Sequence, residues 1–306
     1  VTRLHPDMLI IMETELWPNL IHHCQRRDIP VVVANARLSA KSARGYQRFS
    51  WLSSPMLRDI TLVAAQYPED GQRFVHLGLP ADRLRVTGNI KFDLTFSPEQ
   101  QQLAERLADA WRGANGRPIW LVASTHRGEE EIILDAYRQL LRSVPDLLLV
   151  LVPRHPDRFG EVAELCAKMD FRLVKRSESR VPAPDTQILL GDSMGELAVF
   201  FGACDLAFVG GSLVAVGGHN LLEPAAWGVP VLSGPQLFNF AEISNLLLAA
   251  DALTICNSAD VIASSVLELL GNAVLREEKG AAARAVVDAN RGAMAKLLEV
   301  IAQVAE

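Results

Sequence analysis

The 306 residues are enough for two α/β domains, because typical domains hold about 100 to 200 residues. Hydrophobic residues make up 49% of the chain and charged residues 22%, a composition that excludes disorder and is typical of a soluble globular protein. The net charge of −6 argues against a nucleic-acid partner, and four cysteines without a CxxC pair argue against a zinc site or a disulfide framework. The longest strongly apolar run, residues 147–152, is far shorter than the roughly 20 residues that span a bilayer.

Short apolar segments alternate with longer amphipathic stretches, which is typical of parallel strands joined by crossover helices. The first part of the chain has four strand-like segments, at residues 8–12, 31–35, 61–65 and 84–88. Four strands make an incomplete Rossmann-like domain, and the sequence opens on Val1 without a signal-peptide pattern. We therefore expect a fragment from which earlier strands and helices are left out.

A second series of strands and helices begins after a polar helix predicted over residues 97–113. Strand-like segments follow at residues 119–124, 147–153, 171–175, 187–190, 205–211, 229–233 and 252–256, and we interpret them as a complete six-stranded sheet. The Ala-rich stretch 274–306 has helical spacing of apolar residues and is expected to pack across the domains. The expected domains are residues 1–94 and 95–290, with a C-terminal helix at 291–306 that packs back on the first.

Ligands in open α/β sheets bind at the carboxyl ends of strands, and five strand ends of the second series carry small or polar residues, one of them the turn SGPQLFNFAE at residues 233–242. In the ASTHRGEEE segment, Ser124 or Thr125 can cap a helix whose free N–H groups attract phosphate. The glutamates that follow, Glu129 to Glu131, also fit a structural interpretation, because acidic residues in a first turn complement the helix dipole.

Two further strand ends offer contacts to a nucleotide. In VPRHPDR, prolines stiffen the turn that presents Arg154 and His155, and an arginine there suits a phosphate. In LGDSMGEL, Gly195 lets a base and a ribose approach the backbone closely. Each segment also has a structural interpretation, with Arg154 as a surface arginine and Asp192 as a helix N-cap.

The glycine-rich segment GGSLVAVGGHNLLEPAAWG, residues 210–228, is the strongest indication of a nucleotide site. Gly210 and Gly211 end a buried strand, and the residues from Asn220 to Glu223 open a helix, so backbone N–H groups there can cradle a phosphate. Glu223 can accept hydrogen bonds from two hydroxyls of a ribose.

The first domain contributes fewer candidates. METELWPNLI places Glu13 and Glu15 after a buried strand, and alternation turns only one of them to the cleft if the strand persists. Glu15 is the better candidate, although an ordinary acid at a helix N-terminus also fits. Lys91 in GNIKFD lies at the domain hinge, where a cation can steady a departing phosphate. The histidines lack the spacing of metal ligands, so no metal site is predicted.

Seven motifs in this order, ETELWPNL, NARLSAKSARGY, GNIKFD, ASTHRGEE, VPRHPDR, GDSMGEL and GGHNLLEPA, closely resemble the bacterial 3-deoxy-D-manno-octulosonic acid (Kdo) transferases. Together they are highly specific and extend over residues 13–242. The resemblance implies two Rossmann-like domains of the GT-B glycosyltransferase type, the first one incomplete. It also implies transfer of Kdo from CMP-Kdo to the lipid A precursor, lipid IVA, in lipopolysaccharide core biosynthesis, with inversion and with neither a metal nor a cofactor.

The resemblance also implies which residues form the site. Glu15 and Lys91 fall on positions that support the transition state. The segments that contact CMP include Pro153, Arg154, Met194, Gly195, Glu196, Asn220, Leu221, Leu222 and Glu223, to which the strand ends add Ser124, Thr125 and Gly218.

Members of this family carry a Gly-Glu motif near the N-terminus, preceded by a membrane anchor, and this sequence contains neither. The glutamate of that motif is the general base, which is required because the acceptor hydroxyl must lose its proton as it attacks. The resemblance therefore implies a protein at the cytoplasmic face of the inner membrane that meets the membrane surface through the missing region. We expect the fragment itself to be soluble, to bind CMP and to transfer no sugar.

Two other interpretations stay open from the sequence. Another two-domain nucleotide-sugar enzyme, such as a UDP-sugar 2-epimerase, would also use a turn like GGHNLLEP and would prefer UDP. A non-catalytic nucleotide-binding or partner-binding module would not need Glu15 or Lys91 in its cleft.

Overall fold

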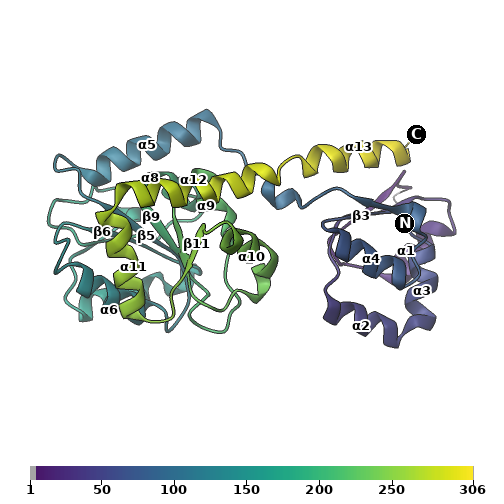
Figure 1. The fold of residues 1–306 in the computed structure, drawn as a ribbon, viewed down its shortest axis with the longest axis horizontal. Coiled ribbons are helices and arrows are strands. Elements are labelled where there is room, and N and C mark those ends of the chain that lie inside the picture. The colour runs from purple at the N-terminus through teal and green to yellow at the C-terminus, as the bar shows by residue number, and fades with distance from the viewer. Residues whose placement is uncertain (1–4, 306) are drawn as a thin grey trace. The chain divides into compact units, whose positions relative to one another are not determined.

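The computed structural model describes residues 5–305, which form two compact α/β units (Figure 1). One unit combines the residues up to Asp93 with those from Ala289 onward, and the other is the continuous segment Leu94–Asp288. Each unit is built on one parallel sheet, which confirms the α/β class predicted from the sequence. No helix among the described residues is long and apolar enough to cross a membrane.

The sheet of the first unit has four parallel strands in chain order. These are β1 (Leu9–Met12), β2 (Val31–Ala36), β3 (Leu62–Ala65) and β4 (Leu84–Val86). The accompanying helices are α1 (Pro18–Gln25), α2 (Ala40–Arg48), α3 (Ser50–Arg58), α4 (Pro68–His76), α13 (Ala293–Ala305) and the short turns η1 (Ala81–Arg83) and η2 (Ile90–Phe92). Prolines start α1 and α4 because their fixed φ suits the first turn of a helix.

Strand β2 forms the centre of this unit and is buried along its whole length. Val31 and Val33 pack with the helices α1, α3 and α4, whereas Val32 and Ala34 pack with Leu297 of α13. Successive side chains of a strand point to opposite faces, so a run of small and β-branched residues fills both layers.

The carboxylate of Asp93, the last residue of GNIKFD, fixes the start of α13. It accepts hydrogen bonds from the backbone N–H groups of Gly292 and Met294, both at 2.5 Å. A carboxylate at this position satisfies N–H groups that a helix leaves unpaired at its first turn. The residues near the end of the chain thereby complete the first unit.

The second unit contains a seven-stranded parallel sheet in the order β11-β10-β9-β5-β6-β8-β7. Its strands are β5 (Ile119–Thr125), β6 (Leu148–Pro153), β7 (Leu173–Lys175), β8 (Ile188–Leu190), β9 (Leu206–Val209), β10 (Val231–Ser233) and β11 (Leu253–Ile255). The predicted count of six strands is therefore wrong. All seven predicted segments form strands. The seventh strand of the sheet is accounted for by β7, which is only partly buried and pairs with β8 at the sheet edge.

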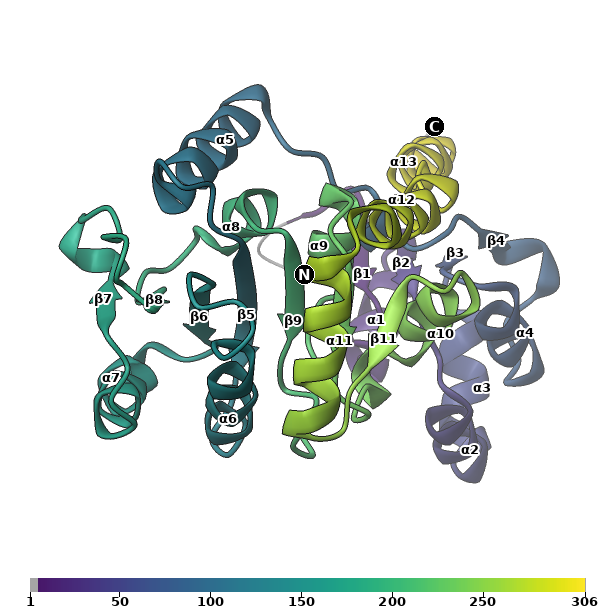
Figure 2. The same cartoon turned by 60° about the vertical axis from the view of Figure 1, so that its left-hand side comes forward.

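Helices cover both faces of this sheet, with α5, α8 and α9 on one face and α6, α7 and α11 on the other (Figure 2). The helices are α5 (Pro98–Arg112), α6 (Glu130–Leu140), α7 (Phe159–Lys168), α8 (Leu197–Ala203), α9 (Leu222–Trp227), α10 (Ala241–Ala249), α11 (Ala259–Gly271) and α12 (Ala273–Ala289), with short turns η3 (Pro156–Arg158), η4 (Arg176–Glu178) and η5 (Phe238–Phe240). A capping box between Ser97 and Gln100 starts α5 as the polar pattern predicts. The fully buried side chains of Trp120 in β5 and Tyr137 in α6 are the largest of the core between the sheet and the helices α6 and α11.

Candidate functional site

Strand β5 lies at the topological switch point of the second unit. After β5 the chain adds β6, β8 and β7 on one side of it and then β9, β10 and β11 on the other. Doubly wound sheets bind ligands in the crevice outside the carboxyl ends of the strands at this point. The candidate site of this unit is therefore formed by the segments that follow β5, β6 and β9.

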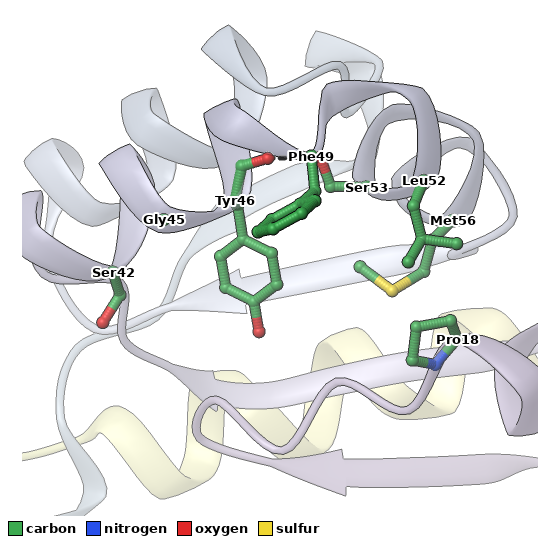
Figure 3. Close-up of a pocket in the computed structure, with 8 residues that line it drawn as sticks. All are labelled: Pro18, Ser42, Gly45, Tyr46, Phe49, Leu52, Ser53 and Met56. Atoms are coloured by element: carbon green, nitrogen blue, oxygen red, sulfur yellow. Dashed lines mark hydrogen bonds between the residues drawn. The ribbon is translucent and has the colours of Figure 1, made fainter.

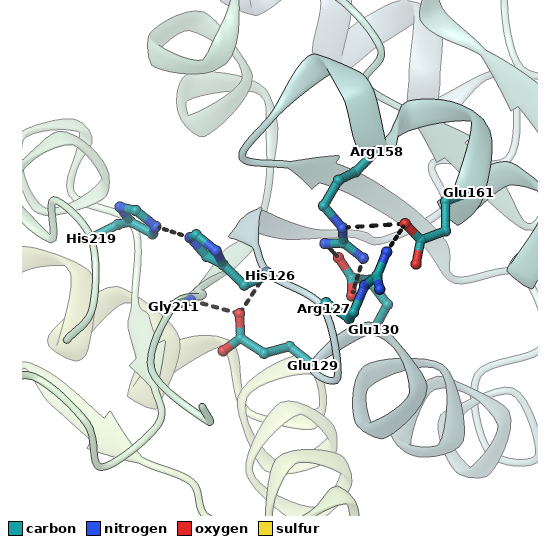
Figure 4. Close-up of polar contacts among 8 residues, drawn as sticks. All are labelled: His126, Arg127, Glu129, Glu130, Arg158, Glu161, Gly211 and His219. Carbon is teal, nitrogen blue, oxygen red and sulfur yellow. Dashed lines mark hydrogen bonds and ion pairs between the residues drawn. The ribbon is translucent and has the colours of Figure 1, made fainter. Parts of the chain in front are cut away.

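The carboxylate of Glu129 joins two of these segments. It accepts backbone hydrogen bonds from His126 at 2.9 Å and Gly211 at 2.6 Å (Figure 4). It also accepts the backbone N–H groups of Ser212 at 2.9 Å and Leu213 at 2.8 Å. The side chain is fully buried, and four N–H donors compensate its charge. The N–H groups after Gly210, predicted as part of a phosphate cradle, are therefore engaged by a carboxylate of the protein itself.

Neither Ser124 nor Thr125 caps α6, so the predicted capping role is wrong. Both belong to β5, and the residue that precedes α6 is Glu129. Ser124 has a φ of +59°, which turns the backbone at the end of the strand. The buried Thr125 hydroxyl has no hydrogen-bond partner within the described part of the chain. Both residues line the switch point, but they do not offer a capped helix end to a phosphate.

The acidic residue Glu130 has a structural partner. Its buried carboxylate pairs with both terminal nitrogens of Arg158, at 2.6 and 3.1 Å, and Arg158 also lies near Glu161 (Figure 4). This paired arrangement fixes η3 next to the first turn of α6. Glu130 therefore fits the structural interpretation rather than a ligand contact.

Arg154 lies at the end of β6, where its backbone N–H donates to the carbonyl of Thr125 at 3.0 Å. Its side chain is exposed, and within residues 5–305 its guanidinium makes no hydrogen bond or ion pair. The ring of the neighbouring His155 lies nearly perpendicular to that of His126, at 82°, with the ring centroids 5.3 Å apart. A planar cation in this position can bind an anion without first breaking an internal ion pair.

Sequence reasoning missed a contact between His126 and His219. Their Nε2 atoms are 2.8 Å apart, and the rings stack with centroids 5.0 Å apart. Burial lowers the pKa of His126 and lowers the pKa of His219 to about 4, so both rings are neutral at pH 7. The two residues are 93 positions apart, and only the pairing of β5 with β9 brings their loops together.

The segment from Gly217 to Glu223 forms a compact loop before α9. Asn220 uses its side-chain oxygen to cap the N–H of Leu222 at 3.1 Å and its amide nitrogen to bind Glu223 at 3.1 Å. Burial raises the pKa of the Glu223 carboxyl, while the hydrogen bond from Asn220 opposes that rise. The position of Gly218 is fixed by its N–H, which donates to the carbonyl of Gly211 at 2.7 Å.

The side chains of Leu221, Leu222 and Pro153 are buried in the protein, so these residues offer a ligand only their backbone. The turn at Met194 to Glu196 is different. Met194 is 63% exposed and Gly195 has a φ of +84°, which glycine adopts without strain. The Glu196 carboxylate binds the Ser193 hydroxyl and Arg176, the latter at 2.6 Å.

The predicted N-cap Asp192 instead binds the backbone N–H and the hydroxyl of Ser177, at 2.8 and 2.6 Å. This contact ties the turn that carries Met194 to the segment after β7. The residue immediately before α8 is Glu196, so the N-cap interpretation of Asp192 is wrong.

In the first unit, Lys91 pairs with Glu13 and not with Glu15. The Lys91 Nζ lies 2.8 Å from a carboxylate oxygen of Glu13, and both side chains are close to half exposed. Strand β1 ends at Met12 and Glu13 adopts a φ of +58°, so the strand alternation assumed for the two glutamates does not continue. The exposed Glu15 side chain has no hydrogen bond or ion pair with residues 5–305.

Polar side chains beneath Lys91 hold its backbone. Asn35, buried at the end of β2 with a φ of +51°, accepts the N–H of Ile90 at 3.2 Å. Gln66 donates to the Asn35 carbonyl at 2.8 Å, and Asn89 caps the N–H of Lys91 at 3.0 Å. Strained backbone and buried amides of this kind gather at functional sites, and sequence reasoning singled out none of them.

A pocket of about 460 Å³ lies between α1, α2 and α3 of the first unit (Figure 3). Pro18, Ser42, Gly45, Tyr46, Phe49, Leu52, Ser53 and Met56 line it. Phe49, one of the lining residues, is 60% exposed, and Trp51, two positions later in the chain, is 75% exposed. An apolar hollow of this size, with large exposed aromatics beside it, can accommodate an apolar group.

Comparison with known proteins gives the family. A sequence model described as "3-Deoxy-D-manno-octulosonic-acid transferase (kdotransferase)" matches residues 1–94. A 3-deoxy-D-manno-octulosonic acid transferase of Haemophilus influenzae is 47% identical over 299 residues, covering 97% of this chain and 70% of the relative. The transferase of the same name from Bordetella pertussis is 36% identical over 308 residues, with coverages of 98% and 70%. The chain belongs to the Kdo transferase family.

Solved structures agree with this assignment. The C-terminal CMP-Kdo binding domain of WaaA from Acinetobacter baumannii is 36% identical and matches with a TM-score of 0.59, covering 62% of this chain and 99% of that domain. A putative UDP-N-acetylglucosamine 2-epimerase from Listeria monocytogenes covers 99% of the chain and 75% of its own with a TM-score of 0.62, but at 15% identity it shows the fold alone. The Kdo transferase thus has the predicted GT-B architecture of Rossmann-like units.

Among the described residues of this Kdo transferase, no group of three or more His, Cys, Asp or Glu side chains is arranged to hold a metal ion. The site chemistry available is that of hydrogen bonds and charge. The second unit offers a free guanidinium, a neutral imidazole pair and the carboxylate of Glu223 at its strand ends, and the first offers the Lys91 ammonium paired with Glu13.

Proposed function

We propose that this Kdo transferase moves Kdo from CMP-Kdo to the lipid A precursor, lipid IVA, with inversion at the anomeric carbon and without a metal. One observation carries the donor assignment. The chain is 36% identical to a CMP-Kdo binding domain, and the match covers 99% of that domain. The unpaired Arg154 at the switch point supports it, because the donor brings a phosphate to the strand ends.

In this proposal the donor lies across the second unit. Arg154 binds the phosphate, while Glu223, oriented by Asn220, accepts hydrogen bonds from ribose hydroxyls. The turn around Met194 and Gly195 lies against the base, where an exposed flexible side chain and a residue without a Cβ allow close contact. Ser124, Thr125 and Gly218 complete the wall of the pocket.

In the transfer step, a hydroxyl of the acceptor attacks the anomeric carbon as the bond from that carbon to the phosphate oxygen breaks. The electron pair of the broken bond stays on CMP, and the hydroxyl proton passes to a base. Lys91 supports the transition state as a cation, and Glu15 acts with it. We propose that the 306-residue segment binds CMP by itself and transfers no sugar.

The pocket of the first unit supports a lipid acceptor. Its apolar lining suits an acyl chain, and α2 carries the cations Lys41, Arg44 and Arg48 near it, which suit the phosphates of an anionic lipid. Exposed aromatics such as Trp51 suit the interface of a membrane. These features support an acceptor held at a membrane surface, and we propose that the complete enzyme acts at the cytoplasmic face of the inner membrane.

Calorimetry of the 306-residue protein with CMP and with UDP tests the donor assignment. We expect CMP to bind more tightly than UDP, and Arg154→Ala to weaken CMP binding by about 10- to 100-fold, the loss expected when hydrogen bonds to a charged group are removed. Arg154→Lys is the matched control and should retain part of the affinity, because it keeps the charge without the fork. Tighter binding of UDP would contradict the proposal and favour a UDP-sugar enzyme.

A further inference from the structure

The imidazole pair of His126 and His219 has no role in the function proposed above. The rings are nearly parallel, at 8°, and their Nε2 atoms are 2.8 Å apart. A hydrogen bond between two imidazoles needs one ring to donate and the other to accept, so at least one ring is neutral in this contact. Figure 4 shows the two rings facing each other, apart from the ion pairs around Arg158.

The pair lies where doubly wound sheets bind the phosphate of a nucleotide. His126 directly follows β5, His219 lies in the loop between β9 and α9, and these two strands are neighbours at the switch point. Arg154 follows β6, the other neighbour of β5. Three basic groups from three different segments therefore gather at one crevice.

The protein is shaped to hold this pair. One oxygen of Glu129 accepts the N–H groups of both His126 and Gly211, so the two loops are fixed to each other. Gly211 also leaves room for the ring, because a Cβ at this position would lie 2.7 Å from Cδ2 of His219. A larger residue at 211 would push the two imidazoles apart.

The charges that face the pair favour an anion. The carboxylates near it are Glu129, which four N–H groups already bind, and Glu130, which is paired with Arg158. The remaining neighbours are the cation Arg154 and the ring of His155. Burial lowers the pKa of both rings, and a negative group beside them would raise it, so binding of an anion can bring a proton onto the pair.

We propose that the His126–His219 pair contacts the phosphate of the CMP portion of the donor, beside Arg154, and takes up a proton as that phosphate binds. The inference rests on the proposed CMP-Kdo donor and adds the groups that receive its leaving phosphate. When the bond from the anomeric carbon breaks, its electron pair stays on the phosphate oxygen. The positive charge that the added proton brings to the pair then stabilises the charge on this oxygen electrostatically.

Calorimetry with CMP and with cytidine isolates the phosphate contact. The wild-type protein should bind CMP more tightly than cytidine, and His126→Ala or His219→Ala should reduce this advantage by about tenfold or more, with cytidine binding unchanged. His23→Ala, an exposed histidine of the first unit, is the matched control and should keep the full advantage. Wild-type protein that binds neither ligand would refute the donor assignment itself, and this inference with it.

Proton uptake provides a second measurement that needs no variant. At pH 7.5, where a phosphate monoester with a second pKa of about 6 is already a dianion, CMP binding in buffers of different ionisation enthalpy should show a net uptake of part of a proton. Cytidine should show none. Absence of proton uptake on CMP binding would overturn the proposal. Histidine variants that melt at a lower temperature yet keep the preference for CMP over cytidine would also overturn it, because the pair would then only hold the two loops together.

Discussion

The strand ends of the two units are built on different principles. In the second unit, the carboxylate of Glu129 is fully buried and, among the described residues, accepts hydrogen bonds only from backbone N–H groups. These hydrogen bonds hold two loops in place. In the first unit, Glu13 and Lys91 pair at a half-exposed position, where an ion pair contributes little to stability. A charge that holds the fold and a charge that is available to a reaction can thus be told apart by burial and by partner.

The largest expected effect is on the buried carboxylate. Glu129→Gln should lower the free energy of unfolding by about 3–5 kcal/mol, because it removes a charge from four hydrogen bonds and leaves buried N–H groups poorly paired. Urea unfolding followed by circular dichroism measures this change. Glu131→Gln, in the first turn of the helix that Glu129 precedes, is the control. An equal loss in both variants would show that the buried carboxylate of Glu129 has no special structural role.

The next effect concerns catalysis by the first unit. In the complete enzyme, Lys91→Ala should lower kcat by about 10²- to 10³-fold, the usual result of removing one group that stabilises developing charge. Transfer of Kdo to lipid IVA under saturating donor measures it. Glu15→Gln in the same assay tests the role proposed for Glu15, and an unchanged rate there would shift the role to Glu13.

The smallest effect is on stability at the same place. Glu13→Gln should change the free energy of unfolding by about 0.5 kcal/mol or less, since exposed ion pairs contribute in that range. The φ of +58° at Glu13 is a cost that glutamine would also bear. A loss of several kcal/mol on urea unfolding would show that the pair holds the fold, and the contrast between the two units would disappear.

The sequence predicted those parts of the fold that depend on local patterns. Apolar segments placed all the strands, and the polar residues at Ser97 and Gln100 marked the start of α5. The motifs also indicated the family, which the relatives confirm. Local patterns determine these features because each is set by neighbours within a few positions along the chain.

Contacts between distant loops could not be predicted in this way. The carboxylate of Glu129 meets the N–H of Ser212 across 83 positions, and His126 meets His219 across 93, so neither has a local pattern. The ion pair between Glu13 and Lys91 was missed for another reason. Alternation assumes a continuing strand, and a left-handed residue directly after β1 turns its side chain to Lys91 instead.

The helix α13 has a consequence for how the protein is made on the ribosome. The first unit needs Leu297 to cover Val32 and Ala34. The carboxylate of Asp93 can accept the N–H of Gly292 only after that residue, 199 positions later, has been synthesised. The intervening segment Leu94–Asp288 emerges complete before that helix does. The unit that is translated first is therefore the one that is finished last, and until then the apolar face of β2 is the surface that chaperones would have to shield.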